Sequence, residues 1–128
     1  MRNLEAVMLE RFLRYIQTER RYSNLTVSAY KKDLEQFAEY LINIYELNDI
    51  TKATNQMARS YVVRLKEMGE ENRSINRKMS ALRSFYKFCL REEAVEISPM
   101  QGIKSLKQPK ELAKFVPEQD MEKVRFDG

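Results

Sequence analysis

The segment from Asn72 to Arg91 contains six basic residues and no acidic one, although the whole chain carries 23 basic and 19 acidic residues. Lysine and arginine bind phosphate oxygens, and the arginine fork also reaches guanine edges, so such a segment favours a polyanion partner. A second basic run lies further along the chain, at Lys104, Lys107, Lys110 and Lys114. A solvated helix face can have the same composition, so charge alone leaves the function open.

The residue types present give little support to catalytic or metal-binding chemistry. The sequence contains no histidine, which excludes Ser-His-Asp and Cys-His nucleophilic sites and every metal site that uses histidine. Cys89 is the only cysteine, so an internal disulfide is excluded and a reducing compartment is expected. Glu92 and Glu93 are adjacent, which places their side chains on different sides of a helix and not together as an acid–base pair. We therefore expect a cytoplasmic binding protein without cofactor or metal.

The apolar residues that must position these groups recur at helical spacing in four segments, at about residues 4–19, 25–47, 54–68 and 73–92. The chain is 43% hydrophobic over 128 residues, which is enough for one domain with a core. Only three glycines and three prolines are present, which argues against a β-sandwich or barrel with its many tight turns. The sequence therefore predicts an all-α fold of four helices. The positions expected to face inward in the first three helices are Leu4, Met8, Phe12, Ile16, Tyr30, Leu34, Phe37, Leu41, Ile44, Met57, Tyr61, Val62, Leu65 and Met68.

Capping residues mark where two of these helices should begin or end. Ser23 or Asn24 suits the N-cap of the second helix, because its side-chain oxygen can accept a hydrogen bond from a free amide of the first turn. Gly69 directly follows the third apolar segment and suits a left-handed residue at a helix end. The longest apolar run has four members, at residues 6–9, so we expect no membrane-spanning segment.

The fourth predicted helix divides sharply into two faces when successive residues are placed 100° apart. Its apolar stripe contains Ile75, Met79, Leu82, Tyr86 and Cys89. The opposite face contains Arg73, Arg77, Ser80, Ser84, Lys87 and Arg91. No residue of that helix offers these cations a carboxylate partner, and small serines between long side chains permit a bulky ligand to approach closely. This face fits the major groove of DNA, where Arg, Asn and Ser contact phosphates and base edges.

The N-terminal turns of the second predicted helix show a weaker version of the same pattern. They contain Thr26, Ser28, Lys31 and Lys32, ahead of several acidic residues. A helix N-terminus attracts phosphate through its free amides and its dipole. Taken alone, these residues also fit a capped helix with ordinary surface lysines.

The sequence changes character after residue 95. Ser98, Pro99, Gly102 and Pro109 are spread through polar, lysine-rich residues, which is typical of an extended, flexible linker at about residues 96–116. Residues 117–128 look like the start of a further helix, with a proline in the first turn and acidic residues that suit the helix dipole. This arrangement is expected when a chain is cut from a longer protein.

Two segments resemble signatures of the Xer- and phage-integrase-type tyrosine recombinases. They are YSNLTVSAYKKDL at residues 22–34 and RSINRKMSALRSFYKF at residues 73–88. Ser98 and Pro99 stand where the family usually has Asn-Pro, and the basic linker falls where the family joins its two domains. The resemblance covers about residues 5–120.

This resemblance implies a SAM-like, four-helix core-binding domain at residues 1–95, a linker at 96–116 and the start of a catalytic domain at 117–128. In the family, the second and fourth helices of the core-binding domain lie against the major groove, as half of a clamp around recombination-site DNA. The catalytic tyrosine and its supporting residues belong to the C-terminal domain, so the resemblance implies that this chain binds DNA and catalyses nothing. The implied partners are double-stranded DNA at a recombination site and other recombinase protomers. The implied DNA contacts are Thr26, Ser28, Lys31, Lys32, Arg73, Asn76, Arg77, Ser80, Arg83 and Lys87.

Two other functions fit the same residues. A helical protein-interaction module could use the basic face to bind an acidic partner protein. A helix-turn-helix regulator fits less well, because a short turn joins its two key helices, whereas a whole helix separates the candidates here.

On the recombinase interpretation, Arg77 lies mid-face and exposed to solvent. Its replacement by alanine should therefore weaken DNA binding and leave the melting temperature nearly unchanged.

Overall fold

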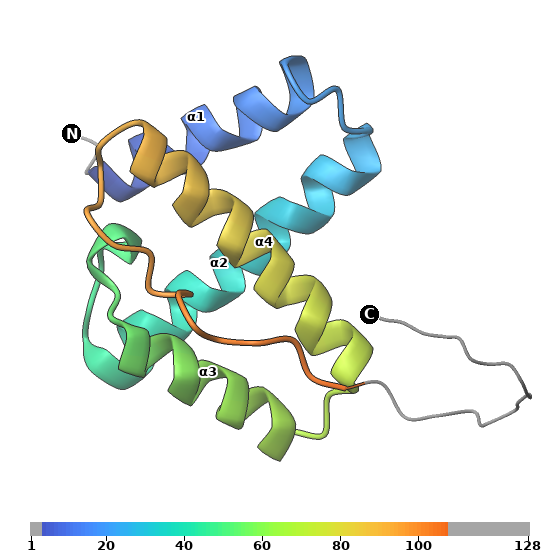
Figure 1. Ribbon diagram of the computed structural model, residues 1–128, viewed down its shortest axis with the longest axis vertical. Helices are drawn as coiled ribbons and strands as arrows, with labels where there is room; N and C mark the ends of the chain where they lie inside the picture. Colours follow the sequence, from blue (N-terminus) through green and yellow to red (C-terminus); the bar gives the residue numbers. More distant parts are fainter. Residues whose placement is uncertain (1–3, 108–128) are drawn as a thin grey trace, which may run out of the picture.

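Four α-helices make up most of the computed structural model, which describes residues 4–107 and their side chains from residue 7 onward. The helices are α1 (Leu4–Thr18), α2 (Asn24–Tyr45), α3 (Asn55–Glu67) and α4 (Asn72–Arg91), and a short 3-10 helix, η1 (Ile50–Lys52), links α2 to α3 (Figure 1). The described residues contain no β-strand, and none of their helices is long and apolar enough to cross a membrane. The all-α, four-helix prediction is confirmed, and each helix end lies within two residues of its predicted position.

Side-chain caps and one glycine set several of the helix boundaries. The Ser23 hydroxyl accepts a hydrogen bond from the Thr26 amide at 3.1 Å and caps α2, as predicted. Thr54 accepts one from the Met57 amide at 3.3 Å and caps α3. Gly69 follows α3 with a φ of 89°, a left-handed conformation that favours glycine. These signals are local in the chain, which explains why the sequence located the helices so closely.

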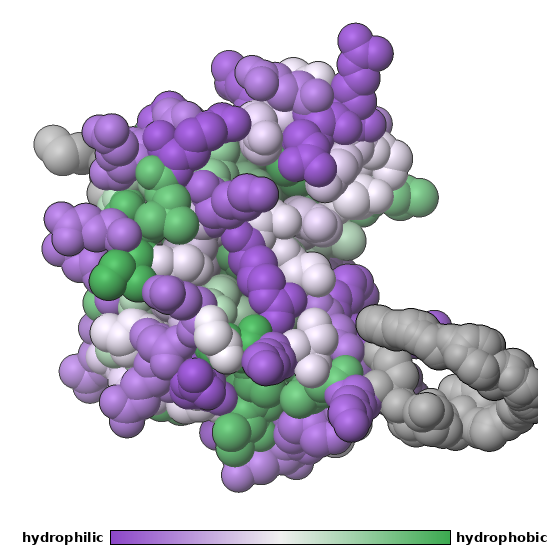
Figure 2. Space-filling view, viewed as in Figure 1, coloured by the Kyte–Doolittle hydropathy of each residue, from purple (hydrophilic) through white to green (hydrophobic). Residues whose placement is uncertain are grey.

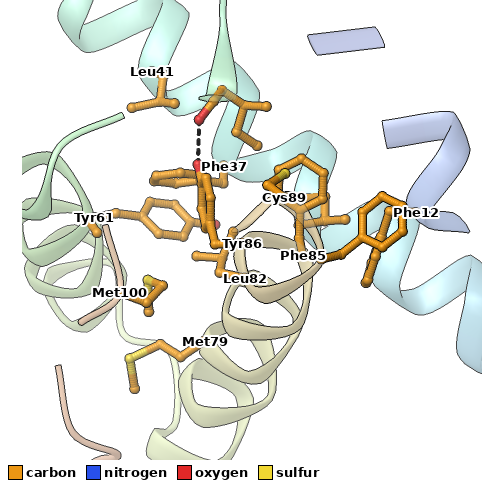
Figure 3. Packing of buried hydrophobic residues seen from close by; sticks show 14 of the residues in the cluster. Phe12, Phe37, Leu41, Tyr61, Met79, Leu82, Phe85, Tyr86, Cys89 and Met100 are labelled. Atoms are coloured by element: carbon orange, nitrogen blue, oxygen red, sulfur yellow. Dashed lines mark hydrogen bonds between the residues drawn. The ribbon is translucent and has the colours of Figure 1, made fainter. Parts of the chain in front are cut away.

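The α4 helix lies at the centre of the bundle and contacts each of the other three α-helices. Its predicted apolar stripe is fully buried, because no member exposes more than 1% of its surface. Phe12 of α1 packs edge-on against Phe85 of α4, with ring centroids 5.5 Å apart. Figure 3 shows how the buried side chains of α2, α3 and α4 meet, with Phe12 at the edge of the cluster. Each large apolar side chain buried in this way contributes about 1.5–3 kcal/mol, so the core is the main source of stability.

Two residues predicted to face inward are exposed instead. Ile44 in the last turn of α2 exposes 46% of its surface, and Met68 at the end of α3 exposes 63%. Tyr45 and Leu47, which follow Ile44, pack against the core in its place. Leu4 also belonged to the predicted set, and its side chain lies outside the described part of the chain.

Two buried tyrosines differ in how well their hydroxyls are paired. The Tyr86 hydroxyl of α4 donates a hydrogen bond to the Ile50 carbonyl at 2.5 Å, which ties η1 to the core (Figure 3). Tyr61 of α3 is 2% exposed, and its hydroxyl has no hydrogen-bond partner within residues 4–107. Its ring packs against Phe37 and Tyr40, and burial raises the pKa of its phenol. A buried hydroxyl without a partner costs free energy, whereas a paired one contributes to stability.

We expect Tyr61→Phe to leave the free energy of unfolding unchanged or to raise it by up to about 1 kcal/mol, because only an unpaired hydroxyl is removed. Tyr86→Phe is the matched control. It should lower the free energy of unfolding by about 1 kcal/mol, because the Ile50 carbonyl loses the Tyr86 hydroxyl and keeps only its hydrogen bond from the Ala53 amide at 3.3 Å. Urea unfolding followed by circular dichroism measures both values. A larger loss for Tyr61→Phe than for Tyr86→Phe would contradict the difference in pairing.

Residues 96–107, here called the strap, run across α3 and α4 (orange in Figure 1). Met100 is 3% exposed and belongs to the core, and Ile103 and Leu106 pack against the core. Residues 96–107 contain no helix or strand, as expected of an extended linker, and apolar residues at every third position attach this part to the bundle. Residues 108–128, which hold the rest of the predicted linker and the predicted helix start, lie outside the described residues.

Candidate nucleic-acid interface

The solvent-facing side of α4 carries basic and hydroxyl residues where the sequence predicted them. Arg73, Ser80 and Lys87 are exposed, and they make no hydrogen bond or ion pair with the side chains described, those of residues 7–107. The opposite side of α4 is the buried stripe, so these side chains project outward from a rigid element. Figure 2 shows hydrophilic residues over much of this side of the molecule.

The α2 helix packs against α4 and presents a second set of polar groups near its N-terminus. Ser28, Lys31 and Lys32 are exposed, and they too make no hydrogen bond or ion pair with other described residues. Thr26 is half-buried, and its hydroxyl hydrogen-bonds with that of Ser23 at 3.0 Å. Three of the four candidates on α2 are therefore available to a ligand, whereas Thr26 takes part in the helix cap.

Arg77, predicted to be free in the middle of the basic side, is held by Asp33 of α2. The guanidinium donates two hydrogen bonds to the carboxylate, from Nη2 to Oδ1 at 2.9 Å and from Nε to Oδ2 at 3.2 Å. Asp33 is only 2% exposed, whereas the Arg77 side chain keeps 55% of its surface exposed. A two-pronged pair of this kind fixes the plane of the guanidinium. The pair therefore orients Arg77 at the surface and joins α2 to α4.

The sequence contains one signal that Asp33 is buried. Asp33 lies three residues after Tyr30 and next to Leu34, on the inward side of α2. A carboxylate at an inward position needs a positive partner, because charged side chains are almost never buried unpaired. The partner is 44 residues away on another helix, so the spacing of residues along α2 does not predict which residue it is.

Two predicted DNA contacts, Asn76 and Arg83, bind the strap. The Asn76 side chain donates a hydrogen bond to the Leu106 carbonyl at 2.8 Å and accepts one from the Leu106 amide at 2.7 Å. Arg83 donates from Nη2 to the Ile103 carbonyl at 2.8 Å. Both side chains lie on the flank of α4 that the strap covers. The Asn76 side chain and one guanidinium nitrogen of Arg83 are therefore engaged within the protein, and the role of both residues in DNA contact stays a prediction.

Two further asparagines complete the anchoring of the strap. Asn55 of α3 donates to the Pro99 and Gln101 carbonyls, each at 2.9 Å. Asn72 of α4 donates to the Lys107 carbonyl at 2.7 Å. Every one of these contacts joins a side chain to backbone atoms. Such contacts leave no spacing pattern in the sequence, and so residue types alone do not predict them.

Lys78 belongs to the basic segment of α4 but not to its exposed side. It is 7% exposed, and its Nζ donates to both carboxylate oxygens of Glu70, at 2.9 and 2.8 Å. Glu70 lies in the turn between α3 and α4, so this ion pair fastens the start of α4 to that turn. The count of six basic residues therefore overstates the positive charge available at the surface.

The candidates that remain at the surface lie on α2 and α4 and are positive or small and hydroxylated. α4 itself contributes no carboxylate. Residues 4–107 contain no group of three or more acidic or cysteine side chains that could hold a metal ion. This arrangement suits a polyanion ligand. We use the name basic face for this set, which consists of Arg73, Arg77, Ser80 and Lys87 on α4 and of Ser28, Lys31 and Lys32 on α2. The two α2 lysines border cavities that Glu35 also lines.

A four-helix domain with one basic face is thus the class of protein that the structure defines, and comparison with known families specifies it further. Residues 9–93 match the family described as phage integrase, N-terminal SAM-like domain, and the chain belongs to this family. The match confirms the resemblance seen in the segments 22–34 and 73–88. No solved structure matches the chain.

Several curated relatives are tyrosine recombinases. Tyrosine recombinase XerC of Bacillus pumilus (strain SAFR-032) is 35% identical over 113 residues, which cover 88% of this chain and 37% of that protein. XerC of Bacillus subtilis (strain 168) has the same identity and coverage. XerD of Halalkalibacterium halodurans is 32% identical over 114 residues, with 89% of this chain and 38% of that protein covered. The chain therefore spans less than half the length of these relatives.

Proposed function

We propose that this chain is the N-terminal, DNA-binding part of a site-specific tyrosine recombinase or integrase, and that its basic face binds double-stranded DNA. The observation that carries the proposal is the basic face, which presents exposed cations on two adjacent helices while α4 supplies no acidic residue. Family membership and similarity to proteins named tyrosine recombinases support it. On this proposal, strand breakage and rejoining belong to the rest of a longer protein, whose protomers are partners at the recombination site.

The basic face offers complementary kinds of contact to a duplex. An α-helix fits the major groove, and the small side chain of Ser80 allows the backbone of α4 to approach it. Arg77 would meet the duplex with its guanidinium already oriented by Asp33, so less side-chain entropy is lost on binding. Lys31 and Lys32 are flexible point charges, which suit phosphates better than base edges.

A cytoplasmic location fits this function and forms part of the proposal. Its support is the nucleic-acid partner together with Cys89, the single cysteine of the chain, which is buried and free. Burial raises the pKa of the Cys89 thiol to about 12, so the thiol stays protonated and unreactive.

The proposal predicts salt-dependent binding to plain duplex DNA. If the five cations of the basic face each neutralise one phosphate, log K should fall with log salt with a slope of about −4.5, at roughly −0.9 per phosphate. Fluorescence anisotropy of a labelled duplex at several salt concentrations measures this slope. Arg73→Ala should reduce the magnitude of the slope by about one, because one phosphate contact is lost.

Lys52→Ala is the matched control, because it removes one positive charge from η1 and leaves the basic face intact. It should leave both the affinity and the slope unchanged. Binding that is absent at low salt, or that does not depend on salt, would contradict the proposal and favour an acidic protein as the partner. An equal effect of Lys52→Ala and Arg73→Ala would show that only net charge matters and that the basic face has no special role.

A further inference from the structure

A second cluster of cations lies around a cavity next to the basic face. The cavity has a volume of about 240 Å³ and lies between the end of α1, the turn that follows it and the C-terminal half of α4. None of the described residues that line it is acidic. We call it the cationic pocket, and its polar lining consists of Tyr15, Arg20, Tyr22, Ser84, Lys87 and Arg91.

The turn after α1 is closed tightly, which fixes Arg20 at the mouth of the pocket. The Arg20 amide donates to the Tyr15 carbonyl at 3.2 Å, and the Tyr22 amide donates to the Ile16 carbonyl at 2.9 Å. Between them, Arg21 has a φ of 57°, which is uncommon for a residue other than glycine. The same left-handed conformation follows α2 at Glu46 and α4 at Glu93, so it terminates α1 as it does those helices and fixes the path of the turn.

Aromatic rings orient two arginines of the pocket. The guanidinium carbon of Arg91 lies 4.5 Å from the ring centroid of Tyr15 and 5.2 Å from that of Phe88. The guanidinium carbon of Arg20 lies 5.4 Å from the ring centroid of Tyr22. A guanidinium stacked on a ring keeps the N–H groups along its edge for an oxyanion. The rings, which carry no charge, therefore help to hold the two cations in place.

The carboxylate beside the pocket is engaged mainly by another residue. Glu92 pairs through Oε1 with Arg11, and its second oxygen lies 3.4 Å from Nε of Arg91. This contact leaves the terminal Nη1 and Nη2 groups of Arg91 for a ligand. A hydrogen bond from Arg20, and a smaller contribution from Arg91, lower the pKa of the Tyr15 phenol.

We propose that the cationic pocket binds a single phosphate group, with Arg20, Lys87 and Arg91 as the cations and Ser84 as a hydroxyl donor. The cavity holds several water volumes of roughly 30 Å³ each, which is enough room for a phosphate group. The phosphate comes either from the backbone of a duplex or from free phosphate in solution. The idea that a duplex supplies the phosphate rests on the proposed function. Lys87 belongs to both the basic face and the cationic pocket, and a duplex bound on α4 would extend toward the pocket.

Titration with inorganic phosphate tests the pocket without DNA. In heteronuclear NMR spectra of the full chain, phosphate should shift the amide signals of residues 20–22 and 84–88 in a saturable manner, against sodium chloride of equal ionic strength. The double variant Arg20→Gln/Arg91→Gln should weaken this binding at least about tenfold. Arg20→Gln alone should weaken it as well, and this variant leaves the stacking of Arg91 on α1 and α4 intact. Lys52→Gln, a matched loss of charge on η1, should change nothing.

Salt-dependent binding to a duplex tests the source of the phosphate. If a backbone phosphate occupies the pocket, the double variant should lower the magnitude of the salt slope by about 0.9, which corresponds to one phosphate contact. Saturable shifts with inorganic phosphate together with an unchanged slope would assign the pocket to free phosphate and overturn the duplex source.

If phosphate causes no saturable shifts and the double variant leaves the salt slope unchanged, the proposal of a phosphate-binding pocket is overturned. The proposed function is then left intact. If the wild-type chain does not bind a duplex at all, the proposed function fails. The phosphate titration then tests the cationic pocket by itself. Saturable shifts in the wild-type chain that disappear in the double variant would support phosphate binding. The absence of such shifts in the wild-type chain would overturn it.

Discussion

Replacing Arg77 with alanine should lower the free energy of unfolding by about 2–3 kcal/mol. The substitution leaves the carboxylate of Asp33 at 2% exposure without the two hydrogen bonds that compensate its burial. Breaking a fully buried ion pair costs about 3–5 kcal/mol, and we reduce this figure because the Arg77 side chain is half exposed to solvent. Urea unfolding of the variant measures the loss. From the sequence alone, Arg77→Ala was expected to leave the melting temperature nearly unchanged, and the contact with Asp33 reverses that expectation.

Two controls separate the ion pair from a general loss of charge on α4. Arg73→Ala removes an exposed cation four residues earlier and should change the free energy of unfolding by less than about 0.5 kcal/mol. The double variant Asp33→Leu/Arg77→Leu removes both charges and should recover most of the stability, because no buried charge is left unpaired. Equal stability of Arg77→Ala and Arg73→Ala would show that Asp33 does not depend on Arg77.

A chain that ends at residue 95 should be about 3–5 kcal/mol less stable than the full chain, because it lacks the strap. Loss of a buried methionine side chain such as Met100 costs about 2–5 kcal/mol by itself. Removal of Ile103 and Leu106 uncovers further apolar surface on the bundle. Thermal or urea unfolding of the shortened chain measures the difference.

A chain that ends at residue 107 is the matched control, because it keeps every strap contact described above. It should stay within about 1 kcal/mol of the full chain. Within the full chain, Met100→Ala should cost about 2 kcal/mol, whereas Gln101→Ala, at an exposed neighbour whose backbone contact survives, should cost less than about 0.5 kcal/mol. Equal stability of chains ending at residues 95 and 107 would contradict a structural role for the strap.

The helices were predictable because the signals that form them lie close together in the chain. The caps at Ser23 and Thr54, the glycine at residue 69 and the apolar stripe of α4 each involve residues within one or a few turns. The strap was not predictable in the same way. Its apolar residues are scattered between lysines and a glycine, and their burial depends on contacts with a core that several helices form together.

The candidate site was predicted in outline and not in detail. Helical spacing separates the outward side of α4 from its buried stripe. Arg73, Ser80 and Lys87 are therefore exposed, as the sequence predicted. The same method cannot distinguish a free cation from one held by another element. Arg77 meets a carboxylate from α2, and Arg83 meets a carbonyl of the strap, through contacts between segments that lie far apart in sequence.

The strap also sets the reach of any segment that follows it. Side chains of α3 and α4 hold its backbone as far as Lys107, close to the first turn of α4. A tether to a neighbouring domain would therefore start at residue 107 and not at residue 95, which shortens it by twelve residues, or about 40 Å of fully extended chain. A shorter tether holds two linked domains at a higher effective concentration on one ligand, provided that it still spans their binding sites.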